Sequence, residues 1–237
     1  MRTGPRAAAV SVRPSVRSRA RRRGGPRPRT EADATRRAIF TAAADLFSRR
    51  GFDGVVVDDI ARAAGVNKAM LYYHFDDKLG LYRDIVQDML RDAGARMAAI
   101  AGSPGPPEAR MTRFIAEFVA LADGRPYFPT LMMREISEGA SHLDGKTLGL
   151  MRVVFLAFCR ILADGHARGD FREVQPILAY MTVLGPVLLN AARERAAAKP
   201  GRRQLPMFVR VPHADLTRHM QEVAQRMLRK DPSPQRT

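Results

Sequence analysis

Cysteine is nearly missing from this chain of 237 residues, in which Cys159 stands alone. A single cysteine excludes an intrachain disulfide and a multi-cysteine zinc site. Long apolar runs are missing too, since Val153–Cys159 and Val183–Leu189 fall far short of the ~18 residues that suggest a membrane span. The sequence therefore predicts no membrane partner, and the chain is long enough to bury a core without covalent support.

Catalytic signatures are also missing. The chain has no GxSxG elbow, no P-loop, no GxGxxG fingerprint and no HExxH or HxxxH pair. Cys159 stands in a helical pattern among apolar residues, which favours a buried, inert thiol over a nucleophile. We therefore expect no enzyme activity, no catalytic residue, no cofactor and no bound metal.

Acidic residues are missing from the first part of the chain. Overall, 40 Lys and Arg face 24 Asp and Glu, a net charge of +16, and ten of the arginines lie within the acid-free residues 1–29. Such a charge favours a polyanionic partner, most commonly nucleic acid. Prolines and the lack of a regular period predict that residues 1–29 are disordered. Three interpretations of this tail stay open: an arm along DNA phosphates, a solvated tail without a role, and a transit peptide.

The remainder of the chain has the pattern of helices. Apolar residues recur at helical spacing from residue 34 to residue 47, and Gly51 follows at a position typical of a helix C-terminus. Farther along, helix-like segments are separated by breaks rich in Gly and Pro, and alternating β patterns are almost absent. This organisation predicts an all-α protein with about nine helices.

Residues 57–75, VDDIARAAGVNKAMLYYHF, have the pattern of two short helices joined by a tight turn. The first helix is expected at about Asp58–Ala64, and Gly65 allows the positive φ of the turn. Asn67 is a suitable N-cap for the second helix, expected at about Lys68–His74. Together they predict a helix-turn-helix, whose second helix presents its N-terminal residues to base edges in the major groove.

The stretches RRAIFTAAADLFSRRGFDGVVVDDIARAAGV and NKAMLYYHFDDKLGLYRDIV resemble the DNA-binding domain of the TetR/AcrR-type transcriptional regulators. The resemblance covers residues 36–90 closely, and LYYHF followed by Lys78 is its most specific part. Val57 is a departure, because such proteins usually carry Thr or Ser there, which caps the helix and often reaches a phosphate. Asp58 is expected to supply the cap instead, at the cost of the phosphate contact.

The resemblance implies a division of the chain into four parts. These are a disordered Arg-rich tail at 1–29, a helix-turn-helix DNA-binding domain at 30–76, a helical effector-binding and dimerisation domain at 77–231, and a tail at 232–237. A helix from about Asp77 would join the two domains. Its pivot would change the spacing of the two recognition helices of a dimer, which must match half-sites ~34 Å apart or a multiple of it.

The resemblance also implies roles for individual residues. Those nearest base edges are Lys68, Ala69 and Met70. Those at phosphate-contacting positions are Arg36, Arg37, Asn67, Tyr72, Tyr73, His74 and Lys78. Several have an ordinary alternative: Tyr73 as a partly buried core residue, His74 as a packing residue, and Lys78 as the partner of a neighbouring aspartate.

The C-terminal part is rich in Met and Phe, which suits an adaptable apolar ligand pocket but equally an ordinary core. The candidate pocket residues are Phe114, Phe118, Phe128, Leu131, Met132, Phe155, Phe158, Met181 and Leu184. The resemblance further implies a homodimer through a four-helix bundle of the last two long helices. The candidate interface residues are Leu178, Leu188, Leu189, Leu216, Met220, Val223 and Met227.

The interpretation that unites these features is a cytoplasmic, dimeric transcriptional repressor that binds a pseudo-palindromic operator in double-stranded DNA. A small apolar or amphipathic effector of unknown identity would release it. One alternative is a nonspecific or constitutive DNA-binding protein driven by the basic tail, with a steep salt dependence. The other is a small-molecule-binding helical protein that no longer binds an operator.

Overall fold

The computed structural model of the chain describes residues 29–197 and 211–230. This part is all-α, as predicted, and contains nine helices and no strand beyond an isolated bridge between Phe171 and Arg229. The helices are α1 (Arg29–Arg50), α2 (Val57–Ala63), α3 (Lys68–His74), α4 (Lys78–Gly102), α5 (Pro107–Gly124), α6 (Tyr127–Ser137), α7 (Gly145–Ala167), α8 (Pro176–Ala197) and α9 (His213–Leu228). Of the predicted tails, 1–29 and 232–237, residues 1–28 and 232–237 lie outside the described residues, whereas Arg29 is the first residue of α1.

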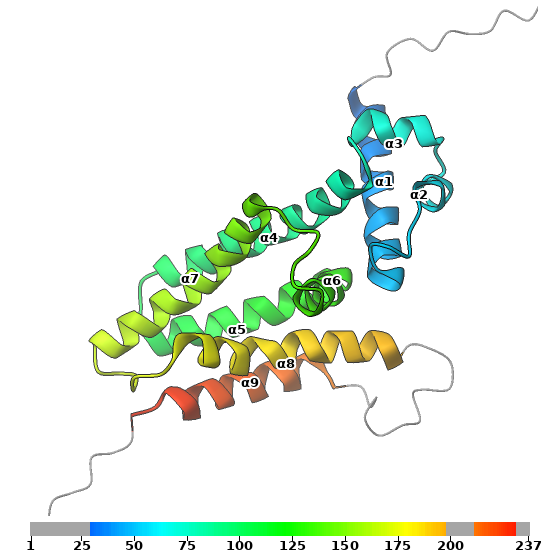
Figure 1. Ribbon diagram of the computed structural model, residues 1–237. Helices are drawn as coiled ribbons and strands as arrows, with labels where there is room; N and C mark the ends of the chain where they lie inside the picture. The colour runs from blue at the N-terminus through cyan, green and yellow to red at the C-terminus, as the bar shows by residue number, and fades with distance from the viewer. Residues whose placement is uncertain (1–28, 198–210, 231–237) are drawn as a thin grey trace, which may run out of the picture.

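Helices α1 to α3 form a small head at one end of the molecule (Figure 1). Its core consists of fully buried side chains that include Phe47, Ile60 and Leu71. α1 ends as predicted, because Gly51 adopts a positive φ of 78° and donates its N–H to the Phe47 carbonyl at 2.8 Å. The head is thus held by apolar residues from all three helices, while the outer face of α3 is left to solvent.

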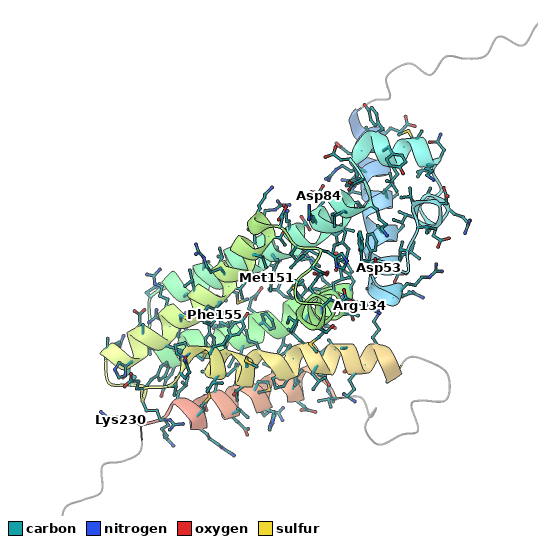
Figure 2. All side chains as sticks on the ribbon, in the orientation of Figure 1. Asp53, Asp84, Arg134, Met151, Phe155 and Lys230 are labelled. Atoms are coloured by element: carbon teal, nitrogen blue, oxygen red, sulfur yellow. The ribbon has the colours of Figure 1, made fainter. Side chains whose placement is uncertain are left out.

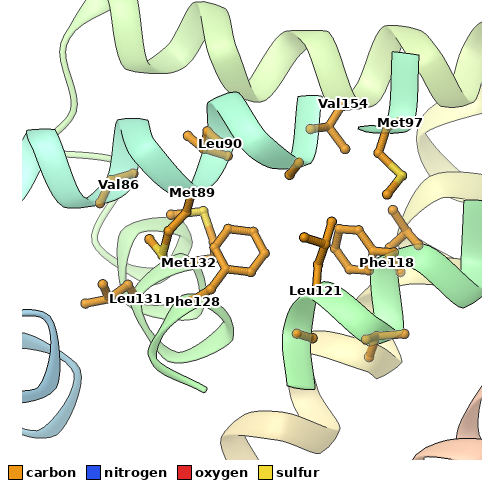
Figure 3. Packing of buried hydrophobic residues seen from close by; sticks show 14 of the residues in the cluster. Val86, Met89, Leu90, Met97, Phe118, Leu121, Phe128, Leu131, Met132 and Val154 are labelled. Carbon is orange, nitrogen blue, oxygen red and sulfur yellow. The ribbon is translucent and has the colours of Figure 1, made fainter. Parts of the chain in front are cut away.

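The long helix α4 leads from the head into the body, where it packs most extensively against α7 (Figure 1). Below this pair lie α5 and then α8 and α9, with α6 between the body and the head. Figure 3 shows the buried side chains of α4 meeting those of α5 and α6, with Met89 and Met132 on one side and Phe118 on the other. α1 contacts both α4 and α6, so the head rests on two elements of the body.

Two local features explain where the body helices begin and turn. The Asp144 carboxylate accepts the Thr147 N–H at 2.8 Å and its hydroxyl at 2.6 Å, which caps the start of α7. Near the other end of α7, Gly165 lets the Phe171 ring lie directly on the helix, where a Cβ would be only 2.0 Å from a ring carbon. The chain after α7 is thereby packed against the body.

Helix α8 is strongly apolar, and several of its large apolar side chains are exposed to solvent. By length and composition alone the stretch Pro176–Arg195 could cross a membrane, and 28% of its most apolar window is buried. One such helix is weak evidence for a span, because core helices of soluble proteins pass the same test. Its exposed residues Leu178, Met181 and Leu189 are each about 60% exposed and recur at helical spacing.

Candidate nucleic-acid interface

The turn between α2 and α3 has the geometry that its sequence predicts. Gly65 adopts a positive φ of 68°, and the Val66 N–H donates to the Ala61 carbonyl at 3.0 Å. The Asn67 side chain accepts the Met70 N–H at 2.9 Å, so Asn67 is the N-cap of α3 as expected. α3 spans Lys68–His74, the predicted range, and the buried Leu71 fixes it to the head.

The start of α2 differs from the prediction. The N-cap residue is Val56, whose side chain makes no capping hydrogen bond, and the helix already begins at Val57. The expectation that Asp58 caps the helix is therefore wrong: its carboxylate forms an ion pair with Lys68 at 3.2 Å instead. Asp58 still lies in the first turn, where its charge complements the helix dipole.

The outer face of α3 carries polar and aromatic side chains that are not buried in the core of the head. Tyr73 is 76% exposed and Tyr72 50% exposed, although large aromatic residues usually bury much of their surface. Lys68 and Ala69 at the start of the helix are exposed as well, and Met70 is half-buried. The interpretation of Tyr73 as partly core does not fit this placement, whereas half-buried His74 packs edge-on against the Tyr73 ring.

Lys78 is held inside the head. Its ammonium group donates to the carbonyls of Phe52 and Val55, each at 3.1 Å, and lies 4.0 Å from the centre of the Phe52 ring. These contacts tie the start of α4 to the segment between α1 and α2. The alternative of a pair with a neighbouring aspartate is not what the structure shows, and a phosphate would have to compete with two carbonyls for this group.

Arg36 is likewise engaged within the molecule. Its guanidinium group donates to the Asp84 carboxylate at 3.2 Å and lies 5.0 Å from the centre of the Phe75 ring. This contact joins α1 to α4, where Figure 2 labels Asp84 beside the head. Its neighbour Arg37 is exposed on α1.

The body contains an apolar cavity of about 260 Å³ that is lined from α4, α5, α6, α7 and α8. Four of the nine predicted pocket residues line it: Phe118, Phe128, Met132 and Phe155. Four others, Phe114, Leu131, Phe158 and Leu184, are buried elsewhere in the core, and Met181 is exposed. The lining residues that the prediction missed are Leu90, Ile136, Met151, Arg152, Val154, Ile177, Tyr180 and Leu188.

The predicted interface residues fall into two groups. Leu178 and Leu189 lie on the exposed face of α8, while Leu188 is half-buried and lines the cavity. On α9, in contrast, Leu216 and Met220 are buried within this subunit, where α9 packs against α5. Val223 and Met227 are half-buried on the same helix.

Cys159 is half-buried on α7, and burial raises the pKa of its thiol. A raised pKa lowers the thiolate fraction, which agrees with the expectation of an unreactive cysteine.

Comparison with known proteins identifies the head. Residues 39–85 match the family model TetR_N, described as bacterial regulatory proteins of the tetR family. The biofilm-operon negative transcriptional regulator IcaR of Staphylococcus aureus is 47% identical over 49 residues, which are 21% of this chain and 26% of IcaR. The repressor NicS of Pseudomonas putida is 27% identical over 152 residues, 60% of this chain and 68% of NicS.

The fold extends the similarity beyond the head. The TetR-family regulator PfmR of Thermus thermophilus superposes with a TM-score of 0.62 at 24% identity, covering 81% of this chain and 99% of PfmR. The resemblance to TetR/AcrR-type regulators is thus confirmed: the chain carries the helix-turn-helix segment of that family on the family's all-α fold. The match to IcaR spans about a quarter of that relative's length.

Proposed function

We propose that the chain is a dimeric, sequence-specific transcriptional repressor that leaves its operator when a small apolar or amphipathic ligand binds. The observation that carries this proposal is the outer face of α3, where Lys68, Ala69, Tyr72 and Tyr73 are exposed on a helix anchored by its opposite face. The head, residues 30–76, would bind DNA in the cytoplasm. Residues 77–231 would bind the effector and the second subunit.

The contacts with bases would come from the first turn of α3, which enters the major groove in helix-turn-helix proteins. Lys68 has the reach for guanine O6 and N7, and Ala69 is small enough to approach a thymine methyl. The ion pair that holds Lys68 to Asp58 is exposed on both sides, so breaking it costs at most about 1 kcal/mol. Met70 would lie at the edge of this surface.

Phosphates would be contacted by the residues around this turn. Tyr72 and Tyr73 have exposed hydroxyl donors, and the Asn67 side chain uses its oxygen for the cap, which leaves its amide group to donate. Arg37 and His74 would add flanking contacts. Such contacts fix the register of the protein on DNA without selecting a sequence.

Arg36 and Lys78 take a different role in this proposal. Arg36 links α1 to α4 through Asp84. Lys78 links the start of α4 to the segment after α1 through two backbone carbonyls. They would hold the head on α4, so that a movement of α4 also moves α3. This is how a change in the body would alter the distance between the two recognition helices of a dimer.

Dimerisation would use the exposed apolar face of α8. Leu178, Met181 and Leu189 form a row of large side chains that a single copy leaves in water. Pairing α8 with its mate would bury this row, and a two-fold dimer matches the pseudo-palindromic operator that two heads require. Leu216 and Met220 would support the interface from within the subunit.

The effector would occupy the cavity in the body. Its lining is almost entirely apolar, with Arg152 and Tyr180 as its polar members, so an apolar body with one acidic or hydrogen-bonding group would suit it. α4 and α6 both line the cavity and both contact α1, which connects it to the head. A Phe155→Trp substitution would narrow the cavity and should weaken effector-induced release from DNA without weakening DNA binding itself.

The proposal is tested by selecting genomic fragments with the purified full-length protein at moderately high salt and sequencing what is retained. Salt suppresses nonspecific phosphate binding, including that of the basic tail, and leaves specific contacts visible. An enriched pseudo-palindrome is the expected result. Ala69→Glu, which places an acid on the exposed face of α3, should abolish enrichment, while the control Ala163→Glu on an exposed position of α7 should not.

The two alternatives give different outcomes in the same experiment. A nonspecific binder driven by its tail would retain fragments without a shared motif and would lose them steeply as the salt concentration rises. A small-molecule-binding protein that no longer binds an operator would retain nothing. Either outcome would refute the repressor proposal.

A further inference from the structure

Three side chains able to bind a metal ion meet where α6 ends. Glu135 lies in the last turn of that helix, Glu138 is its C-cap residue, and His142 follows in the connection to α7. One ligand atom from each lies within 4.8 Å of the others. The His142 Nδ1 atom is 3.1 Å from a Glu135 oxygen and 3.6 Å from a Glu138 oxygen.

The two separations from the His142 Nδ1 atom are close to those in the coordination shell of a small divalent ion. Ligand atoms bound at about 2.0–2.2 Å in a tetrahedral shell lie roughly 3.3–3.6 Å from one another. The backbone brings His142 back over the helix end, because Gly139 and Ala140 have successive positive φ values of 67° and 59°. An alanine rarely adopts this conformation, so the surrounding contacts must hold the turn.

Glu135 supplies the independent sign of a ligand. Its side chain is only 1% exposed, and its oxygen Oε1 accepts the Tyr82 hydroxyl proton. Its other oxygen, Oε2, is buried and has no hydrogen-bond partner among the residues that the structure describes. A buried carboxylate oxygen without a partner is costly, and a bound cation would satisfy it.

The other contacts of the cluster agree with this role. The Tyr82 hydroxyl donates to Glu135 Oε1 and so orients the carboxylate. Two arginines lie near the cluster: the Arg83 Nε donates to the His142 carbonyl, and the Arg134 guanidinium lies where a Cβ on Gly51 would meet it. Two carboxylates and one imidazole nitrogen make a donor set that a divalent cation can bind.

We propose that Glu135, Glu138 and His142 bind one divalent transition-metal ion of the zinc class, with an open position left for water. A mixed nitrogen and oxygen ligand set suits Zn²⁺ and its neighbours, whereas Mg²⁺ and Ca²⁺ prefer oxygen alone. The site lies at the junction of head and body. The His142 ring packs on Phe52 at 4.4 Å between ring centres, and Tyr82 belongs to α4.

The proposal does not depend on DNA binding and is tested without DNA. Metal-free, tag-free full-length protein is titrated with Zn²⁺ by calorimetry and with Co²⁺ by visible absorption. One ion per chain is expected. His142→Ala and Glu138→Gln should each weaken binding by at least the roughly 10- to 100-fold that loss of a mere outer-shell partner costs. Because Glu138 is exposed, its variant should fold normally, which circular dichroism checks.

His213 is the matched control. It also stands between two carboxylates, but opposite ring nitrogens face them: Nδ1 faces Asp123 at 3.2 Å and Nε2 faces Glu194 at 3.8 Å. One ion cannot bridge this arrangement, so His213→Ala should leave binding unchanged. The proposal is overturned if the protein binds no ion, if binding survives both ligand variants as an adventitious surface site would, or if His213→Ala removes it.

Discussion

The role that the resemblance implies for Lys78 differs from the contacts that Lys78 makes in the structure. The resemblance implies a phosphate contact, whereas the structure places the ammonium group 3.1 Å from each of two carbonyls and over the Phe52 ring. Lys78→Met keeps most of the side-chain length and removes the charge. It should therefore weaken the attachment of the head to α4 without removing a contact with DNA.

The magnitude follows from the contacts that are lost. A hydrogen bond to a charged group contributes about 1.5–3 kcal/mol, and a partly exposed cation–π contact about 0.5–1 kcal/mol. Because Lys78 is only half-buried, water replaces part of each contact, and the expected loss of unfolding free energy is roughly 2–4 kcal/mol. For a chain of this size that corresponds to a fall in Tm of about 4–16 °C.

Two assays separate the two roles, with Arg37→Met as the control. Thermal unfolding at fixed protein concentration measures stability, and the salt dependence of DNA binding counts phosphate contacts. Lys78→Met should lower Tm and leave the salt slope unchanged, whereas exposed Arg37→Met should leave Tm nearly unchanged and reduce the slope by about 0.9. The reasoning is refuted if Lys78→Met keeps the Tm of the wild type and reduces the slope.

Three further predictions concern the body. Gly149→Ala should raise the unfolding free energy by about 0.5–1 kcal/mol, because alanine has the higher helix propensity and nothing lies within 4 Å of the added Cβ. Gly165→Ala on the same helix should lower it by about 1–3 kcal/mol, because its Cβ would lie 2.0 Å from the Phe171 ring. Denaturant titrations measure both variants, and equal changes in unfolding free energy would contradict this prediction. Asp144→Ala should cost about 1 kcal/mol at pH 7. Because its hydrogen bonds to Thr147 lower the pKa of the Asp144 carboxyl, that difference should disappear as pH falls through the depressed pKa, which unfolding at several pH values measures. Leu178→Glu should convert the proposed dimer to a monomer in sedimentation velocity, whereas Leu156→Glu, also at an exposed apolar position, should not. Identical behaviour of the two variants would rule out the α8 face as the interface.

Local signals made the helix-turn-helix predictable. The Asn67 side chain accepts the Met70 N–H at the start of α3, and Gly65 permits the positive φ of the turn, so a few adjacent residues determine the boundaries. Both were placed correctly from the sequence. The cap of α2 was not placed correctly. The Asp58 carboxylate can either cap α2 or pair with Lys68, and only the folded head brings Lys68 within reach.

Contacts between distant residues could not be predicted in the same way. The carbonyl partners of Lys78 lie 26 and 23 residues before it, and Tyr82 lies 53 residues from Glu135. Helical spacing identifies an apolar face but does not say what covers it. For this reason Leu216 was predicted at a subunit interface although it packs within its own subunit, and only some of the predicted pocket residues meet the cavity.

The central claim is that the exposed face of α3 selects the operator sequence. The most direct test repeats the fragment selection with wild type, Lys68→Ala and the control Lys146→Ala, which removes an exposed lysine from the start of α7. Wild type and control should enrich the same pseudo-palindrome, and Lys68→Ala should lose its preference at one position of each half-site, at a cost of about 1–3 kcal/mol. An unchanged motif with Lys68→Ala, or no motif with the wild type, would contradict the account.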